Sequence, residues 1–205
     1  MKSGEYDVKK ILSGLPEFDP ACDTGLEIGC GIGRLLRPMN AHFARLYGVD
    51  ISPEMIRLGR DWLRAYPKVK LAETSDNTLR MVDDNTVDLV YSYITFQHIP
   101  ARKHITRYMR EAFRVLKPGG WFRFQTFCVR SPWKYVKNRI RVLVNRKADC
   151  FAGYSWRTSA LRRSVQACGF QEVEIRNKVE YEGKAPYLIG QPEGHVWCTG
   201  RKARC

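Results

Sequence analysis

Three glycines spaced two residues apart are the first feature of this chain whose types and spacing could do chemistry. Gly29, Gly31 and Gly33 follow a short apolar run, residues 26–28, that contains the acidic residue Glu27. A strand that passes through a glycine turn into a helix presents unpaired N–H groups and the positive end of a helix dipole to a ligand. Glycine permits positive φ there and lets the backbone approach the ligand closely. The stretch therefore predicts a nucleotide-type binding site.

The spacing of these glycines distinguishes the turn from the dinucleotide-binding fingerprint. That fingerprint requires G-x-G-x-x-G, and Arg34 stands at its last glycine. The pattern found is Glu-x-Gly-x-Gly-x-Gly, for which a tight turn without ligand is the alternative interpretation. Cys30, inside the turn, is interpreted as a small filling residue rather than a nucleophile.

The elements that must position this turn alternate between strand and helix. After the strand that leads into the turn, further strands are predicted at residues 45–51, 69–72, 87–93, 121–127, 170–179 and 195–200. Helices are predicted over residues 8–15, behind the turn (through residues 35–46), over 52–67 with Ser52 as N-cap, over 105–116, and from a Thr158 or Ser159 cap to Ala167. Lys117-Pro118-Gly119-Gly120 is expected to end the fourth of these helices before the next strand begins.

This alternation implies a parallel, doubly wound sheet. Two final strands without a helix between them imply an antiparallel pair at one edge. We therefore expect an α/β, Rossmann-like sheet of seven strands, mostly parallel, with an antiparallel last strand. Residues 1–205 are expected to form a single domain, with a lead-in at 1–23 and a basic, aromatic insertion at 130–157.

Composition limits the class of protein. The chain has 205 residues, a net charge of +14 and a pI near 9.7. No apolar run is long enough for a transmembrane helix, and the N-terminus lacks a signal peptide, so a cytoplasmic location is expected. The seven cysteines are scattered without a C-x-x-C pair, which argues for reduced thiols and against a zinc site; no metal is predicted. The positive charge favours anionic partners without choosing among metabolites, membranes and nucleic acid.

The succession of motifs resembles the class I S-adenosylmethionine-dependent methyltransferases, in particular the small methyltransferase type 11 group. The resemblance covers residues 26–120 well, through the Glu27–Gly33 turn, Asp50, the stretch Thr-Ser-Asp-Asn-Thr-Leu at 74–79 and the Pro118-Gly119-Gly120 turn, and continues more loosely to the last strand. It implies S-adenosylmethionine as cofactor and S-adenosylhomocysteine as product. The match at 74–79 is looser than the others.

The resemblance also implies roles around the cofactor. Backbone amides of the turn would approach its amino acid portion, Glu27 would face the ammonium, and Asp50 would accept both ribose hydroxyls while Ile51 packs on the adenine. Asp76 would accept from the adenine amino group, and the Tyr91 and Ser92 carbonyls would face the methionine portion. The cofactor-binding residues expected are Glu27, Gly29, Cys30, Gly31, Gly33, Asp50, Ile51, Asp76, Asn77, Tyr91 and Ser92.

The acceptor side follows the fourth strand, at the sheet edge where ligands bind. Histidine changes charge near neutral pH, so His98 is a candidate general base, and a packing role is the alternative. Tyr93 and Phe96 either line the methyl channel or belong to the core. The insertion at 130–157 either forms a substrate lid that recognises an anionic acceptor, with Trp133, Tyr135 and Arg139 as candidate contacts, or is a solvated surface helix.

The function expected from the sequence is methyl transfer to oxygen or nitrogen of a small, anionic or aromatic molecule. An RNA methyltransferase is an alternative, although the [DNS]-P-P-[YFW] motif and a Pro-Cys nucleophile are absent, so nucleic acid is possible but not favoured. A regulatory protein that binds S-adenosylmethionine without turnover is the third interpretation. Oligomeric state is not assigned from the sequence.

Overall fold

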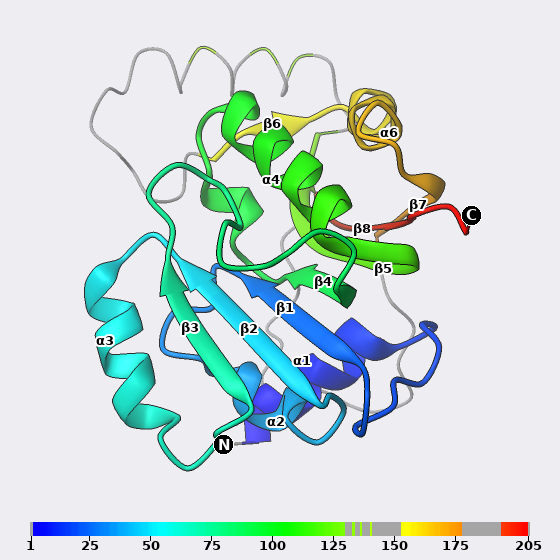
Figure 1. Ribbon diagram of the computed structural model, residues 1–205. Helices are drawn as coiled ribbons and strands as arrows, with labels where there is room; N and C mark the ends of the chain where they lie inside the picture. The colour runs from blue at the N-terminus through cyan, green and yellow to red at the C-terminus, as the bar shows by residue number, and fades with distance from the viewer. Residues whose placement is uncertain are drawn as a thin grey trace.

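The protein is built on one mixed β-sheet with helices on both faces. The computed structural model describes residues 2–129, 133, 136, 140, 153–177 and 194–204. Within them the strand order is β3-β2-β1-β4-β5-β8-β7, and a short eighth strand, β6, pairs with β5 (Figure 1). The strands are β1 (Thr24–Ile28), β2 (Arg45–Asp50), β3 (Val69–Glu73), β4 (Val87–Ser92), β5 (Leu116–Cys128), β6 (Ser155–Trp156), β7 (Gln171–Arg176) and β8 (His195–Arg201).

Strand direction confirms the predicted fold class. β3, β2, β1, β4 and β5 are parallel neighbours, whereas β8 runs antiparallel to both β5 and β7. All five residues of β1 are buried, as expected for a central parallel strand that is covered on both faces. The last strand therefore lies inside the sheet, between β5 and β7, and only β7 forms that edge. The seven predicted strands are present, and β6 is an addition that was not predicted.

Two apolar layers fix the helices to the sheet. Figure 1 shows α1 (Lys2–Leu12), α2 (Leu36–Met39) and α3 (Pro53–Trp62) on one face, and α4 (Arg102–Val115) and α6 (Thr158–Gln166) on the other. Ile11 and Ile56 belong to the core of the first face, and Met109 and Leu161 to the core of the second. A 3-10 turn, η1 (Phe96–His98), joins β4 to α4.

Several predicted helix ends agree with the structure. Ser52 caps α3, because its hydroxyl accepts a hydrogen bond from the Met55 amide at 3.3 Å. Gly14 has a φ of +69°, the left-handed conformation that follows many helices. The first helix nevertheless begins six residues earlier than predicted, at Lys2, and α3 ends at Trp62, well before Pro67.

Other local predictions were wrong. The helix behind the glycine turn is only α2, because its i→i−4 bonds end at Asn40 and the chain then closes through i→i−3 turns at Ala41 and His42. The helix before Lys117–Gly120 does end where predicted, since α4 ends at Val115, but those four residues already belong to β5. Arg157, not Thr158 or Ser159, is the N-cap residue of α6, and it caps without a side-chain bond. The predicted strand over 170–179 is β7, which ends at Arg176; residues 178 and 179 lie outside the described residues.

Candidate functional site

The glycine turn is tied to the end of β2. The amides of Gly29 and Cys30 both donate to the Val49 carbonyl, at 2.8 and 3.0 Å, and the Gly31 amide donates to the Asp50 carboxylate at 2.8 Å. A side chain on Gly31 would meet no heavy atom within 4 Å, so the turn borders open space at this point. The turn thus faces a space that a ligand could fill, with its backbone held from behind.

Glu27 lies beneath this turn as a buried carboxyl. It is 2% exposed, and the Tyr91 hydroxyl donates to its Oε2 at 3.3 Å. Burial raises the pKa of Glu27 to about 8, although the Tyr91 bond and the nearby Arg34 charge act in the opposite direction. Ser92, also buried, donates to the Ile28 carbonyl at 2.9 Å, so β4 is bound to β1 at the level of the turn.

Asp50 is the residue that links the turn to the following helix. Its Oδ2 accepts from the Gly31 amide, and its Oδ1 accepts from the Ser52 amide at 3.0 Å. Ile51, the next residue, is 68% exposed, an unusual position for a large apolar side chain beside a buried strand end. The pair presents a carboxylate and an apolar surface side by side.

A cavity of about 150 Å³ lies at the ends of β2 and β3, bordered by Val49, Thr74, Asp76 and Met81 among others. Asp76 accepts from the Thr78 hydroxyl at 2.5 Å and from Arg80 at 2.5 Å, and the Thr78 bond in particular lowers the pKa of Asp76. Its neighbour Asn77 has a φ of +58° and lies 2.7 Å from Nδ1 of His104. Asp76 therefore lines the cavity, and both Asp76 and its neighbour Asn77 are already engaged with other side chains.

The segment after β4 packs directly on the glycine turn. The Thr95 hydroxyl lies 3.3 Å from the Gly29 carbonyl oxygen, and a Cβ on Gly29 would come within 2.2 Å of the Thr95 side chain. Between them and the strand, Ile94 has a φ of +61° and is 42% exposed. A β-branched residue in this conformation is strained, and such strain is concentrated at functional sites. The acceptor-side segment and the cofactor-side turn are thus one packed unit.

The two predicted aromatic residues of this segment differ in their surroundings. Tyr93 directly follows the carboxyl end of β4, is 7% exposed and stacks on Trp197 with 5.5 Å between ring centroids. Phe96 is fully buried against Tyr108 and Phe124, so it has no exposed surface to offer an acceptor in this structure.

His98 is exposed at the end of η1, and its Nε2 lies 3.2 Å from the Gln97 amide nitrogen. Residues near the end of the insertion pack on the same turn. A Cβ on Gly153 would lie 1.5 Å from the Gln97 carbonyl oxygen, and the Tyr154 amide donates to the Ile99 carbonyl at 2.8 Å. The described end of the insertion therefore contacts the backbone next to His98.

Sequence reasoning missed the contacts made by the first helix. Asp7 accepts from Arg34 at 2.7 Å and from the Tyr93 hydroxyl at 3.1 Å, so one carboxylate links α1, the glycine turn and the end of β4. On β5, the buried Arg123 donates to the Ile11 and Ser13 carbonyls at 2.8 and 2.6 Å. The only sequence signal for either contact was the polar residue itself, because partners more than 25 residues away leave no local pattern.

The remaining predicted residues are placed as follows. Cys30 is 5% exposed, and burial raises the pKa of its thiol, as for a filling residue. Gly33 has a φ of +86°, and a Cβ there would clash with Leu63. Trp133 is 77% exposed, whereas Tyr135 and Arg139 lie outside the described residues. In the part of the chain that the structure describes, no cluster of three metal-ligating side chains is found and no helix is long and apolar enough to cross a bilayer.

Comparison with known proteins gives a consistent family. Residues 26–124 match the family model for a methyltransferase domain. Phosphoethanolamine N-methyltransferase from Triticum aestivum is 31% identical over 147 residues, which is 68% of this chain and 28% of that protein. A tRNA N(3)-methylcytidine methyltransferase from Schizosaccharomyces pombe is 30% identical over 122 residues, 56% of this chain and 48% of that protein. The chain thus spans less than half the length of both of these curated relatives.

The fold comparison agrees with the sequence comparison. Geranyl diphosphate methyltransferase, solved in complex with S-adenosylmethionine, superposes with a TM-score of 0.71 at 16% identity, over 97% of this chain and 85% of that one. At this identity the superposition shows a shared fold.

Proposed function

Because this chain belongs to the class I S-adenosylmethionine-dependent methyltransferases, we propose that it transfers a methyl group from S-adenosylmethionine to an oxygen or nitrogen of a small acceptor that is anionic or aromatic. The observation that carries the proposal is the packing of the Tyr93–Thr95 segment on the glycine turn, with Thr95 Oγ1 3.3 Å from the Gly29 oxygen. A cofactor on the turn and an acceptor beside that segment would be held next to each other, and such positioning can supply much of the rate.

The residues present fit the cofactor. Open space in front of Gly31, the carboxylate of Asp50 beside the exposed Ile51, and the cavity near Asp76 supply places for its polar and apolar parts. Glu27 would face the ammonium group, and Asp50 would accept from the ribose. When bound, the cofactor supplies a methyl group activated by a sulfonium.

On the acceptor side, the residues of this chain would orient the nucleophile and take its proton. His98 is exposed beside the segment after β4, where it could accept a proton from a hydroxyl or an ammonium acceptor. The insertion at 130–157 would close over the acceptor, which is supported by the packing of Gly153 on the backbone of Gln97. An anionic acceptor is favoured by the net charge of +14 and by relatives named for phosphoethanolamine and geranyl diphosphate.

The first experiment separates cofactor binding from turnover. Asp50→Asn keeps an acceptor for the Gly31 amide but removes the negative charge offered to the ribose, so S-adenosylmethionine should bind about 10 to 100 times more weakly by calorimetry. His98→Ala should bind the cofactor normally and lose methyl transfer. Asp83→Ala, an exposed turn residue, is the matched control and should change neither quantity. Unchanged cofactor affinity in Asp50→Asn would refute the assigned ribose contact.

A labelled-methyl assay on a metabolite extract then identifies the acceptor class. Product in the small-molecule fraction supports the proposal. Product in the RNA fraction supports the second candidate function, an RNA methyltransferase, which the tRNA-methylating relative favours. Cofactor binding without transfer to either fraction would instead indicate a non-catalytic binding protein.

A further inference from the structure

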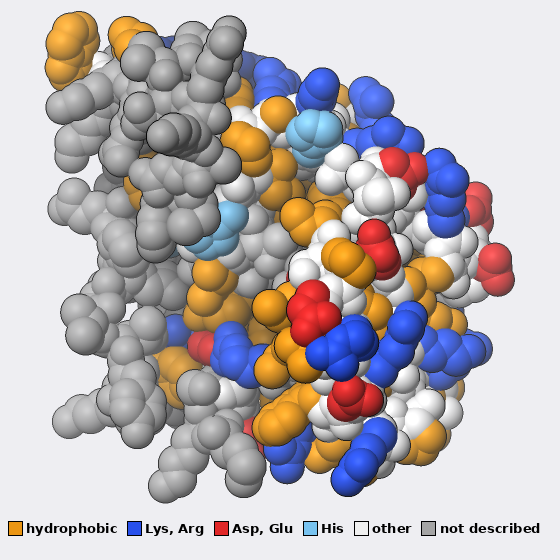
Figure 2. All heavy atoms as spheres, turned by 90° about the vertical axis from the view of Figure 1, so that its left-hand side faces the viewer, with side chains coloured by type: hydrophobic (Ala, Val, Ile, Leu, Met, Phe, Trp, Pro, Cys, Tyr) orange, Lys and Arg blue, Asp and Glu red, His pale blue; other side chains and the backbone are white. Residues whose placement is uncertain are grey.

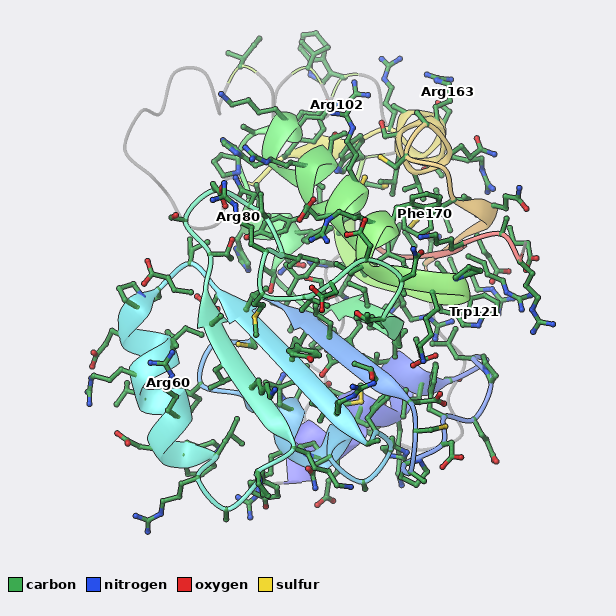
Figure 3. All side chains as sticks on the ribbon, viewed as in Figure 1. Arg60, Arg80, Arg102, Trp121, Arg163 and Phe170 are labelled. Atoms are coloured by element: carbon green, nitrogen blue, oxygen red, sulfur yellow. The ribbon has the colours of Figure 1, made fainter. Side chains whose placement is uncertain are left out.

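The positive charge of this protein is unevenly divided between the two faces of its sheet. The exposed residues of α4, of α6 and of the α6 N-cap include seven cations and no exposed Asp or Glu in the described chain: Arg102, Lys103, Arg107, Arg110, Arg157, Arg162 and Arg163. On the opposite face α3 carries two acidic and two basic residues, Glu54, Asp61, Arg57 and Arg60. Figure 3 shows Arg102 and Arg163 on the α4/α6 side and Arg60 on α3, at the other side of the molecule. We call the seven cations the α4/α6 basic face.

The cations on α4 lie on one side of that helix. Lys103, Arg107 and Arg110 are separated by four and three residues, so they point in similar directions, with roughly 5–6 Å between successive Cβ atoms. The residues that alternate with them, such as Ile105 and Met109, are buried in the core. In Figure 2, a row of Lys and Arg side chains runs along the upper edge, at the height of α4 in Figure 1, and others lie over the lower half.

The two helices hold these cations together as one surface. Arg102 donates to the Ser164 hydroxyl on α6 at 2.8 Å and lies over the Trp156 ring at 5.3 Å from its centroid. The acidic residue of α4, Glu111, is turned toward Arg114, with which it forms an ion pair at 2.9 Å. The charge of the basic face is therefore not offset by acids on its own helices, although Arg107 lies 3.8 Å from the carboxylate of Asp76, which belongs to the loop after β3.

The chemistry of the face selects among anionic partners. Six of the seven cations are arginines, whose planar guanidinium binds phosphate oxygens in pairs. α4 and α6 themselves expose no large apolar side chain, whereas a membrane-binding surface places apolar side chains among its cations. The exposed large apolar residues of the described chain lie outside these two helices, for instance Met55 and Trp62 on α3 and Trp133 in the insertion. Because the two helices also expose no aromatic ring for base stacking, we expect contact with phosphates rather than with bases.

We propose that the α4/α6 basic face is a docking surface for the phosphate backbone of RNA, bound without regard to base sequence. The choice of RNA rests on the second candidate function above, whereas the surface itself is independent of which molecule accepts the methyl group. Both helices follow segments at the carboxyl edge of the sheet, η1 and β6, so RNA on this face would lie next to the candidate site.

The test measures the salt dependence of RNA binding by the full chain. Lys103→Gln, Arg110→Gln and Arg163→Gln are combined in one variant, and Arg60→Gln, Arg64→Gln and Lys68→Gln, equally exposed on and after α3, form the matched control. Filter binding to a single-stranded RNA is measured over a range of NaCl. The first variant should bind about tenfold more weakly at low salt, and its log–log salt slope should be smaller by about 2, since each phosphate contact contributes about 0.7. The control should match the unmodified protein in slope.

Three results would overturn the proposal: an unchanged slope in the α4/α6 variant, an equal loss in the α3 control, or binding to vesicles of equal phosphatidylcholine and phosphatidylserine without binding to RNA. Tighter binding to DNA of the same sequence would overturn the choice of RNA. Circular dichroism melts of both variants establish that they fold. Because filter binding reads occupancy, RNA that binds but is not methylated would count against the second candidate function alone.

Discussion

Glu27 is a carboxyl that the fold keeps away from water. With one 3.3 Å bond from Tyr91 and 2% exposure, its charged form is poorly solvated, and burial raises its pKa to about 8 from an unfolded value of about 4.3. Between these two pKa values, the folded chain holds a proton on Glu27 that the unfolded chain releases. Stability from this group is therefore complete below about pH 4 and is lost as the pH rises through about 8.

Glu27→Gln should remove this pH dependence. The glutamine still accepts a bond from Tyr91, so we expect the variant to gain stability relative to the unmodified protein as the pH rises from 5.5 to 8.5, by about 3 kcal/mol. Urea unfolding across that range measures the difference. Glu17→Gln, at an exposed position, should show no such trend, and a pH-independent difference for Glu27→Gln would contradict the buried-proton interpretation.

Residue types at the site could be predicted from the sequence, whereas their long-range partners could not. The glycines, Glu27 and Asp50 sit on one strand–turn–helix pattern or at a strand end, and these positions follow from local periodicity. The contact of Asp7 with Arg34 and Tyr93 joins positions 27 and 86 residues apart. Nothing in the sequence around Asp7 distinguishes it from a solvated helical residue.

At the scale of elements, the packing of the β6 approach on η1 depends on one missing side chain. Gly153→Ala would place a Cβ 1.5 Å from the Gln97 carbonyl oxygen, which is backbone and cannot rotate away. We expect a loss of about 1–3 kcal/mol in unfolding free energy and a lower rate of methyl transfer, because η1 holds His98. Gly14→Ala is the comparison: its surroundings are open, so it reports the backbone cost of a positive φ alone, about 1–2 kcal/mol. Full activity in Gly153→Ala would refute this coupling.

The C-terminal end of α1 depends on Arg123. This buried guanidinium bonds two carbonyls at the end of the helix and the Thr199 hydroxyl on β8, and burial lowers its pKa to about 10. Arg123→Met should leave those carbonyls without a donor and cost about 3 kcal/mol. Hydrogen exchange should accelerate in α1 more than in α4. Arg64→Met, an exposed change, should leave both helices protected, and equal exchange in Arg123→Met and the unmodified protein would show that α1 is held by apolar packing alone.

Elements with strong local signals were predicted and those set by the sheet were not. The N-cap at Ser52 and the buried strand β4 could be predicted because their signals lie in neighbouring residues of the sequence. By contrast, Lys117–Gly120 has the sequence of a turn but belongs to β5. The pairing of β5 with β4 is irregular there, because the register shifts between Val87 and Leu89. β6 has only two residues and exists because β5 offers it a free edge. Tertiary pairing overrides local preference in both cases.

At the scale of the whole molecule, a net charge of +14 opposes compaction. Seven exposed cations, without an exposed Asp or Glu among them, lie on the α4/α6 basic face. Adding NaCl screens this repulsion, so the Tm should rise by a few degrees between low salt and about 0.5 M. The Lys103, Arg110 and Arg163 triple variant should start higher and gain less from salt than the α3-side triple variant. A Tm that falls with salt in the unmodified protein would show that its ion pairs outweigh the repulsion.

The place of β8 between β5 and β7 also constrains the order in which the sheet can assemble. β7 reaches the sheet through β8 alone, and the outer edge of β5 stays bare along residues 121–127 until β8 arrives. The ribosome must therefore translate at least to Arg201 before β8 can pair with β5. Until then, the unpaired N–H and C=O groups along β5 can pair with strands of other chains. In this sheet, a strand from late in the sequence is inserted between two others and does not form the edge.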